Sequence, residues 1–429
     1  GDEDPTRVFI QGPPPVPLQK ATTRAFATIG EEFSYVITVP AVPHTSPLYD
    51  VRILDDLVAS AADLEFVGVT KLSGAGNWNP VNTGTATNLV IEDTANGIDI
   101  PIGQQASIEV TVRLSDSAAN VAGLTFTNTA AYTYNLTDND AVTERPGDPG
   151  TSGPMTIVEP ELTLEKSGPL RMRVGIPETF TLNVHNAGTS PAYATYLTDL
   201  LPNLATGGMC DVAPAAVTAQ LFEADGVTPA APMLTAGTDY AVTFNGDPAC
   251  TFTLEMLTTA AAIGPDQRLI VTYEAFLDAD TPDDTVLTNI AGATEWFGLD
   301  VSDAAQAAYA RTYSRVLTDG TVGVLDHEDA HTLVEFSPLL IFEKTAINVT
   351  SGEDPATVAA PGNTIRYALR VENASDTAID NFSIVDELDQ LNALPAFAAG
   401  TLTVVTLPAG ADTGNTDPNG GASGTGLLD

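Results

Sequence analysis

The stretch Glu159–Gly168, EPELTLEKSG, decides how this chain is interpreted, because related stretches occur in two other places. Successive side chains of a β-strand point to opposite faces of the sheet, so Leu162, Leu164 and Lys166 share one face of a strand here. The alternation therefore predicts a strand whose apolar face carries a lysine. The same pattern recurs in the segments that end at Lys20 and Lys344.

Lysine is rare in this chain, and its positions follow the repeat. The four lysines are Lys20, Lys71, Lys166 and Lys344, and all but Lys71 stand at the inward end of the first strand of a repeat. An ammonium group on an apolar face is costly unless it is paired or neutralised. Each repeated lysine therefore needs a polar partner in the same layer.

Two further polar residues recur on the inward side of later strands. An aspartate stands in an Asp-x-Leu corner in every repeat, at Asp55, Asp199 and Asp386. An asparagine opens an Asn-x-Ala strand in the first two repeats, at Asn128 and Asn289. Asp56, which the opposite strand parity would select, remains an alternative to Asp55. The third repeat has no Asn-x-Ala strand before the sequence ends.

The composition indicates an all-β protein of several domains. Thirty-five Gly and thirty Pro separate many short runs of Val, Thr, Ile, Leu and Ala, and 43% hydrophobic residues are enough for packed cores. We expect tandem immunoglobulin-like antiparallel β-sandwich domains in an elongated array, over residues 1–157, 158–336 and 337–429. The Pro- and Gly-rich segment 144–155 is predicted to be a linker. The third sandwich is expected to be incomplete, as a fragment or as a domain completed by a strand of another chain.

Charge and cysteine content limit the possible binding partners and the cellular location. Acidic residues outnumber basic ones 56 to 16, which makes nucleic acid an unsuitable partner and favours divalent cations or cationic surfaces. No apolar run reaches transmembrane length. Cys210 and Cys250 stand in one repeat, where turn residues flank both. They suit a disulfide in an exported domain, and two buried free thiols are the alternative.

The order of these motifs resembles isopeptide-forming domains of bacterial fimbrial and pilin proteins. The stretches Tyr35–Leu57, Phe180–Pro202 and Ile365–Leu388 also resemble β-sandwich repeats of large bacterial and archaeal surface proteins. This resemblance implies that the lysine amine attacks the asparagine side-chain amide, assisted by the aspartate, and releases ammonia. The implied sets are Lys20, Asp55 and Asn128, then Lys166, Asp199 and Asn289, with Lys344 and Asp386 as an incomplete set. A buried Lys–Asp salt bridge without a cross-link is the alternative.

These features predict a structural role for an extracellular or cell-surface protein. We expect a segment of a stalk, fibre or adhesin that contacts other domains or chains of the same protein, or a ligand on a host or environmental surface. A bond between the first and last strands would block the shear that unfolds a sandwich. The cross-linking would run once per domain, without turnover and without a cofactor.

Two alternatives come from other functional classes. His327, Glu328 and His331 form a literal H-E-x-x-H motif, which on a helix would hold zinc for a secreted protease. Val334 stands where the metzincin continuation requires glycine. Asp326, Glu328 and Asp329 are instead candidate ligands for structural calcium, as is the turn 137–140. The second alternative function is a glycan-binding module that uses its loops.

Overall fold

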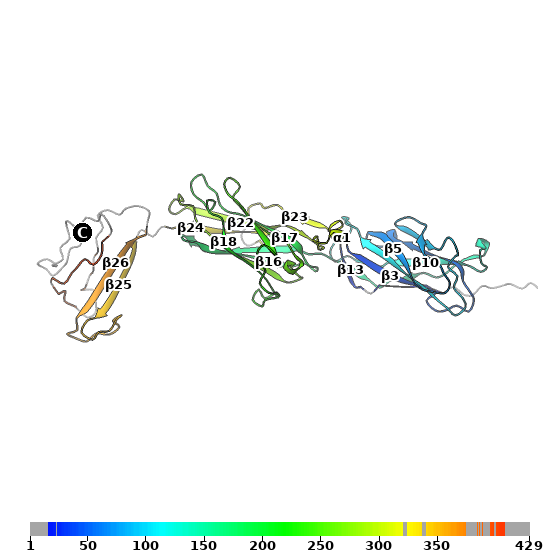
Figure 1. Ribbon diagram of the computed structural model, residues 1–429, viewed down its shortest axis with the longest axis horizontal. Coiled ribbons are helices and arrows are strands. Elements are labelled where there is room, and N and C mark those ends of the chain that lie inside the picture. The colour runs from blue at the N-terminus through cyan, green and yellow to red at the C-terminus, as the bar shows by residue number, and fades with distance from the viewer. Residues whose placement is uncertain are drawn as a thin grey trace, which may run out of the picture. The chain divides into compact units, whose positions relative to one another are not determined.

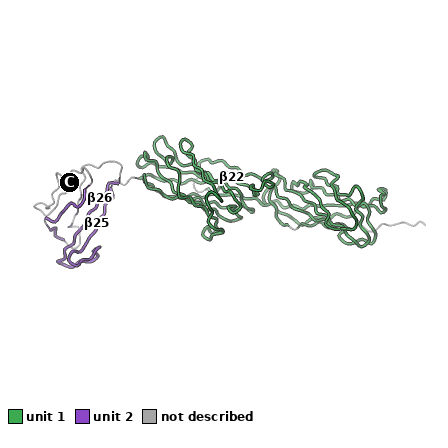
Figure 2. Tube along the Cα trace, viewed as in Figure 1, with its two compact units in different colours: residues 1–336 green, residues 337–429 purple. Residues whose placement is uncertain are grey.

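The computed structural model describes residues 16–22, 24–320, 324–336, 340–374, 384, 386, 388, 395–398 and 400–407. The chain divides into two compact units, residues 1–336 and residues 337–429 (Figure 2). Unit 1 contains two separate hydrophobic cores, one built by residues between 18 and 157 and the other by residues between 162 and 333.

The first core lies between two main sheets of antiparallel strands (Figure 1). One sheet has the order β1-β3-β8-β5, from β1 (Gln19–Thr22), β3 (Glu32–Val39), β5 (Leu64–Ser73) and β8 (Ala106–Leu114). The other has the order β11-β10-β4-β7-β6, with β12 paired to β10; it consists of β4 (Tyr49–Asp56), β6 (Val81–Asn82), β7 (Asn88–Glu92), β10 (Thr129–Asn135), β11 (Glu144–Pro146) and β12 (Gly150–Thr151). A small third sheet joins β2 (Phe26–Thr28), β13 (Met155–Val158) and β9 (Thr125–Phe126).

The second core repeats this plan. One sheet has the order β14-β16-β21-β18, from β14 (Leu162–Ser167), β16 (Glu178–Asn186), β18 (Ala215–Phe222) and β21 (Arg268–Ala275). The other has the order β15-β24-β22-β17-β20-β19, with β23 paired to β22; it consists of β15 (Arg171–Met172), β17 (Tyr193–Leu200), β19 (Tyr240–Asn245), β20 (Thr251–Met256), β22 (Val286–Phe297), β23 (Thr312–Ser314) and β24 (Glu328–Glu335). The helical turns of unit 1 are η1 (Leu57–Ala59), η2 (Ala141–Thr143), η3 (Thr259–Ala261) and α1 (Ala304–Ala307).

The chain is therefore all-β, and its sandwiches are of the immunoglobulin-like kind that the alternating sequence predicts. The strand patterns explain why, since β3 and β16 bury every second residue against the opposite sheet. Tyr35 and Ile37 in β3, and Phe180 and Leu182 in β16, are fully buried.

The linker prediction for residues 144–155 is wrong. This segment forms β11 and β12, which both pair with β10, and Met155 is fully buried at the start of β13. Its prolines lie at strand ends, and Gly147 and Gly150 lie at close contacts; a Cβ on Gly150 would meet the backbone oxygen of Leu18 at 2.2 Å. The asparagine strands are consequently not the last ones, because β12 and β13 follow β10 and β24 follows β22.

Charged and aromatic side chains connect the two sandwiches of unit 1. The Arg311 guanidinium donates to Asp116 at 2.6 Å and to Glu159 at 2.7 Å, and the Tyr313 hydroxyl also donates to Glu159 at 2.8 Å. The Arg113 guanidinium lies 3.3 Å from the centre of the Tyr309 ring. The segment between β22 and β24 of the second sandwich therefore contacts the first sandwich through hydrogen bonds, ion pairs and a cation–π contact.

Unit 2 contains one described sheet, formed by β25 (Leu340–Asn348) and β26 (Ile365–Asn373). The two strands are antiparallel, and Lys344 stands opposite Leu369. The side chains of Leu340 and Phe342 are exposed here. Most of the residues from 375 to 394, on which the prediction of an incomplete third sandwich depends, lie outside the described residues.

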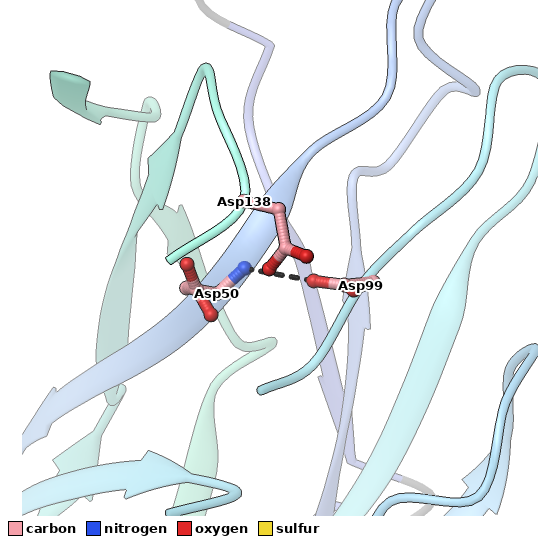
Figure 3. A group of neighbouring side chains, drawn as sticks. All are labelled: Asp50, Asp99 and Asp138. Atoms are coloured by element: carbon pink, nitrogen blue, oxygen red, sulfur yellow. Dashed lines mark hydrogen bonds between the residues drawn. The ribbon is translucent and has the colours of Figure 1, made fainter. Parts of the chain in front are cut away.

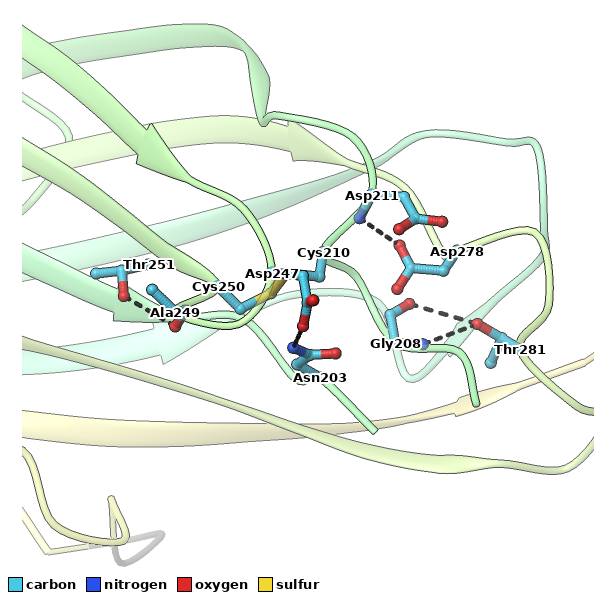
Figure 4. Close-up of a disulfide and its surroundings, with 10 residues drawn as sticks. All are labelled: Asn203, Gly208, Cys210, Asp211, Asp247, Ala249, Cys250, Thr251, Asp278 and Thr281. Atoms are coloured by element: carbon cyan, nitrogen blue, oxygen red, sulfur yellow. Dashed lines mark hydrogen bonds between the residues drawn. A yellow bond between two sulfur atoms is a disulfide. The ribbon is translucent and has the colours of Figure 1, made fainter. Parts of the chain in front are cut away.

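Cys210 and Cys250 are joined in a disulfide in the second sandwich (Figure 4). Both residues are buried, and their Cα atoms are 5.3 Å apart. The loops around them are fixed by further bonds, including one from the Asp211 amide to Asp278 at 2.8 Å. The disulfide therefore anchors the section that makes the second repeat longer than the first.

Within the described part of the chain, helices long and apolar enough to span a membrane are not found.

Replacing both Cys210 and Cys250 by serine should lower the stability of the second sandwich selectively. Opening a covalent loop with a sequence separation of 40 residues restores entropy to the unfolded chain, which corresponds to about 4 kcal/mol. Differential scanning calorimetry should show a lower unfolding temperature for the second sandwich only. The cysteine-free first sandwich is the internal control, and an equal shift of both transitions would contradict this assignment.

Candidate functional site

The second sandwich brings together the lysine, aspartate and asparagine that its sequence singled out. Lys166 on β14 stands opposite Leu182 on β16, and Asp199 on β17 stands opposite Ala291 on β22. Asn289 precedes Ala291 on the same face of β22, which makes it a diagonal neighbour of Asp199. All three polar side chains point into the core between the sheets.

A buried tyrosine completes this group. Lys166 Nζ donates to Asp199 Oδ2 at 2.5 Å and to the Tyr273 hydroxyl at 2.9 Å. The hydroxyl donates to Asp199 Oδ2 at 2.6 Å and accepts from Asn289 Nδ2 at 3.1 Å. Tyr273 is thus in contact with every member of the set. The sequence reasoning missed it, although its inward position on the alternating strand RLIVTYEA was visible.

The first sandwich places its three residues in the same way. The Lys20 ammonium and the Asp55 carboxylate form a salt bridge with both side chains fully buried. Asp55 stands opposite Ala130 on β10, and Asn128 precedes that alanine as Asn289 precedes its own. The Asn128 backbone is fixed by Ser152, whose amide donates to the Asn128 carbonyl at 2.9 Å. The repeated motif therefore occupies equivalent register positions in two cores.

Several acceptor atoms in these sites have no hydrogen-bond partner. In the described residues of both sandwiches, Oδ1 of the aspartate and Oδ1 of the asparagine are buried and unpaired, at Asp55, Asp199, Asn128 and Asn289. A buried carboxylate oxygen facing apolar surroundings is unfavourable unless a proton or donor reaches it. Each site therefore contains one aspartate oxygen and one asparagine oxygen that lack a hydrogen-bond donor.

Burial also changes the proton affinity of the lysines. Desolvation lowers the pKa of Lys20 and of Lys166, and the neighbouring charges of Asp55 and Asp199 oppose this shift only in part. The pKa of Tyr273 is raised, first by burial and then by the negative charge of Asp199. The surroundings therefore favour the neutral amine and keep the phenol protonated.

An aromatic ring lies beside the lysine in every repeat. The lysine nitrogen is 4.4 Å from the ring centre of Tyr35 in the first repeat, 5.5 Å from that of Phe180 in the second and 4.6 Å from that of Tyr367 in the third. Each ring belongs to the strand that pairs with the lysine strand, two residues before the residue opposite the lysine. Aligning the repeats would have found this ring, which stabilises a nearby cation through its quadrupole.

The third lysine is placed differently. Lys344 Nζ donates to Asp386 at 2.7 Å, so the expected pair is present. The two side chains keep 32% and 27% of their surface exposed, however, so the prediction of a buried position is wrong for Lys344. Lys344 lies on the two-stranded sheet of β25 and β26, and among the described residues of unit 2 no second sheet packs against this one.

Asp56, the alternative to Asp55, has a different role. Its side chain is exposed, and its Oδ1 accepts a hydrogen bond from the Val58 amide at 3.1 Å, which caps η1. The strand parity chosen from the sequence therefore selects the buried Asp55.

The zinc-protease hypothesis fails on secondary structure. The H-E-x-x-H residues lie at the start of β24 and not on a helix, so the Cα atoms of His327 and His331 are separated by about 13 Å of strand. Their side chains have different partners: His327 Nε2 lies 3.2 Å from the carbonyl of Val316, and His331 Nε2 lies 2.8 Å from the carbonyl of Pro169. The two imidazoles cannot share one metal ion.

The calcium candidates near this motif each bind backbone amides. Glu328 accepts from the Thr318 amide at 2.7 Å, Asp329 accepts from the Lys166 amide at 2.9 Å, and Asp326 accepts from the Glu328 amide at 2.9 Å. Of these contacts, the one from Lys166 to Asp329 fixes β24 beside β14. Burial lowers the pKa of Lys166, and the negative charge of Asp329 joins that of Asp199 in opposing this shift only in part.

Three other carboxylates form the one acidic group of this kind in the described residues. Oxygens of Asp50, Asp99 and Asp138 lie within 4.8 Å of one another (Figure 3). Burial raises the pKa of Asp99, and the charges of Asp138 and Asp50 add to this effect, whereas a hydrogen bond from the Asp50 amide opposes it. Oxygen ligands of this type suit calcium. Of these three, only Asp138 lies in a turn that the sequence had singled out.

Comparisons with known proteins give only distant likenesses. No protein-family model matches this sequence, and no curated protein matches it. The C-terminal domain of the Streptococcus agalactiae AgI/II polypeptide BspA is 8% identical with a TM-score of 0.32, over 75% of this chain and 100% of that one. The Enterococcus faecalis MSCRAMM ACE, described as binding its ligands by the collagen hug model, is 10% identical with a TM-score of 0.25, over 74% and 94%. The collagen adhesin CNA from S. aureus is 7% identical with a TM-score of 0.22, over 83% and 94%. These values are too low to assign a family or a function.

Proposed function

We propose that this chain is a load-bearing segment of an extracellular stalk, fibre or adhesin, and that its two sandwiches of unit 1 form intramolecular isopeptide bonds. The bonds would join Lys20 to Asn128 and Lys166 to Asn289. One observation carries the proposal: the same buried lysine, aspartate and asparagine stand at equivalent register positions in two separate cores. A salt bridge alone would not require the asparagine.

The chemistry is an acyl transfer within the folded domain. A proton passes from the lysine ammonium to the aspartate, which removes two charges from a core where each is poorly solvated. The neutral amine attacks the asparagine Cγ, the bond from Cγ to Nδ2 breaks, and ammonia leaves. The protonated aspartate can donate to the asparagine Oδ1, which supplies the donor that the unpaired oxygens lack and stabilises charge on the amide oxygen.

The bond would connect two strands that belong to different sheets and share no backbone hydrogen-bond ladder. Lys166 lies on β14 in one sheet, and Asn289 lies on β22 in the facing sheet. A covalent link between the two sheets prevents their separation under load, and it also shortens the loop available to the unfolded chain.

The disulfide in the second sandwich supports an oxidising, extracellular setting. The partners would be other domains or chains of the same protein and a surface ligand.

Intact-mass spectrometry tests the bonds directly. The full chain should weigh less than its sequence by one ammonia for each of the two bonds, because each bond expels one molecule. Lys20→Ala and Lys166→Ala should each restore one ammonia, while the other sandwich keeps its own loss. Lys71→Ala is the matched control, since Lys71 Nζ donates to the Gly76 carbonyl at an exposed position. An unshifted wild-type mass would leave only buried salt bridges.

The stability of an uncross-linked variant should depend on pH through Lys166. Asn289→Ala keeps the lysine and the aspartate but cannot form the bond. Burial lowers the pKa of Lys166 in the folded state below 10.5. Between the folded-state pKa and 10.5, the unfolded chain therefore binds more protons than the folded chain, so the free energy of unfolding should rise with pH in this range. Denaturant titrations should show this slope, at most about 1.4 kcal/mol per pH unit, relative to Lys166→Met in the same background. A slope of zero would mean that folding does not change the proton affinity of this amine.

Single-molecule stretching tests the mechanical role. Pulled by its ends under reducing conditions, unit 1 should not lengthen by the chain enclosed between Lys20 and Asn128 or between Lys166 and Asn289. Asn289→Ala should release the second of these segments and leave the first one closed. Full extension of the wild-type chain would contradict a load-bearing bond.

A further inference from the structure

We propose that Tyr273 is a catalytic residue of the second sandwich, where its hydroxyl carries a proton from Lys166 Nζ to the departing Nδ2 of Asn289. This inference rests on the proposed isopeptide bond and names a residue that the Lys–Asp–Asn motif does not contain. Tyr273 is the group that touches both reacting nitrogens, at 2.9 Å from Lys166 Nζ and 3.1 Å from Asn289 Nδ2.

The Tyr273 ring is held firmly in this position. It stacks on Phe180 with ring centres 5.5 Å apart and planes inclined by 12°, and it packs against Phe252 at 4.9 Å. Phe180 is also its direct partner across the β16–β21 pair. Because the ring is fully buried, bulk water does not reach the hydroxyl. A proton that moves in this core must therefore move through protein groups.

The relay closes the proton balance of the reaction. When Lys166 Nζ bonds to the Asn289 Cγ, the new bond leaves Nζ with one proton in excess. Nδ2 must gain one proton to leave as ammonia. Nζ gives its proton to the Tyr273 oxygen, which gives its own proton to Nδ2, so the phenol ends unchanged. The hydrogen bond from the hydroxyl to Asp199 Oδ2, at 2.6 Å, keeps the oxygen lone pairs directed at the two nitrogens until this step.

The first sandwich supplies a natural comparison. Tyr273 stands opposite Phe180, whereas the equivalent pair in the first sandwich is Tyr35 on β3 and Val110 on β8. Valine has no hydroxyl, and the only tyrosine of that pair lies on the other strand. The Tyr35 ring contacts Lys20, but its hydroxyl makes no hydrogen bond to the described members of the first set. Of the two sandwiches in unit 1, the second therefore has the relay and the first does not.

Time-resolved mass spectrometry of newly made full-length protein tests the relay. Cell-free synthesis is stopped at intervals, and cross-linked peptides from each sandwich are quantified after digestion. In Tyr273→Phe, the second bond should form about 100-fold more slowly, as expected for the loss of general acid–base catalysis, while the first bond forms at the wild-type rate. Tyr240→Phe removes another buried tyrosine from the same core, one whose hydroxyl donates to the Val217 carbonyl and touches none of the reacting groups, and it should change neither rate.

A second variant separates catalysis from folding. Leu221→Ala weakens the same core at a buried position on β18 and leaves the polar set intact. The second bond should form at the wild-type rate in this variant once the Cys210–Cys250 disulfide reports a folded domain. Equal slowing in Leu221→Ala and Tyr273→Phe would overturn the relay, as would a wild-type rate in Tyr273→Phe. A wild-type chain that loses no ammonia would instead refute the isopeptide bonds themselves.

Discussion

A lysine ammonium held against an aspartate carboxylate inside a hydrocarbon layer is the interaction on which both sandwiches of unit 1 depend. Burial penalises both charges, and removing one partner would leave an uncompensated charge that costs about 3–5 kcal/mol. A core with such a pair is stable only if the pair is well placed or if chemistry removes the charges. The proposed isopeptide reaction would do the latter, because it would convert the amine and the amide into one neutral amide and free ammonia.

Strand register makes this placement reproducible. The lysine comes from the edge strand of one sheet, and the aspartate and asparagine come from adjacent strands of the facing sheet. Because Asp199 is opposite Ala291, the asparagine two positions earlier on β22 must share its face, and Asp55 and Ala130 repeat that relation. The hydrogen-bond ladder that builds this sheet therefore places the aspartate and the asparagine on one face, toward the lysine-bearing sheet.

The surroundings of the two sets differ in ways that bear on reactivity. The second sandwich adds Tyr273 and the charge of Asp329 near Lys166, whereas the first places the Tyr35 ring against Lys20. The disulfide and the contacts of Arg311 add further constraints within unit 1. These contacts act on different parts of the structure. The lysine, aspartate and asparagine sets link the two sheets within each core, the disulfide closes one long section of the second sandwich, and Arg311 connects the two sandwiches.

The sequence by itself determined the all-β class, the inward positions of Lys20 and Lys166 and the residues aligned with them, because strand alternation is a local property that period-two patterns reveal. It favoured Asp55 and left Asp56 as the alternative of opposite parity, and the structure buries Asp55 and exposes Asp56. Only the tertiary structure decided that Tyr273 joins the set, that segment 144–155 forms strands, that the H-E-x-x-H residues begin a strand and that Lys344 is exposed. Each of these depends on which strands become neighbours, and pairing between distant segments is set by the packing of the whole core.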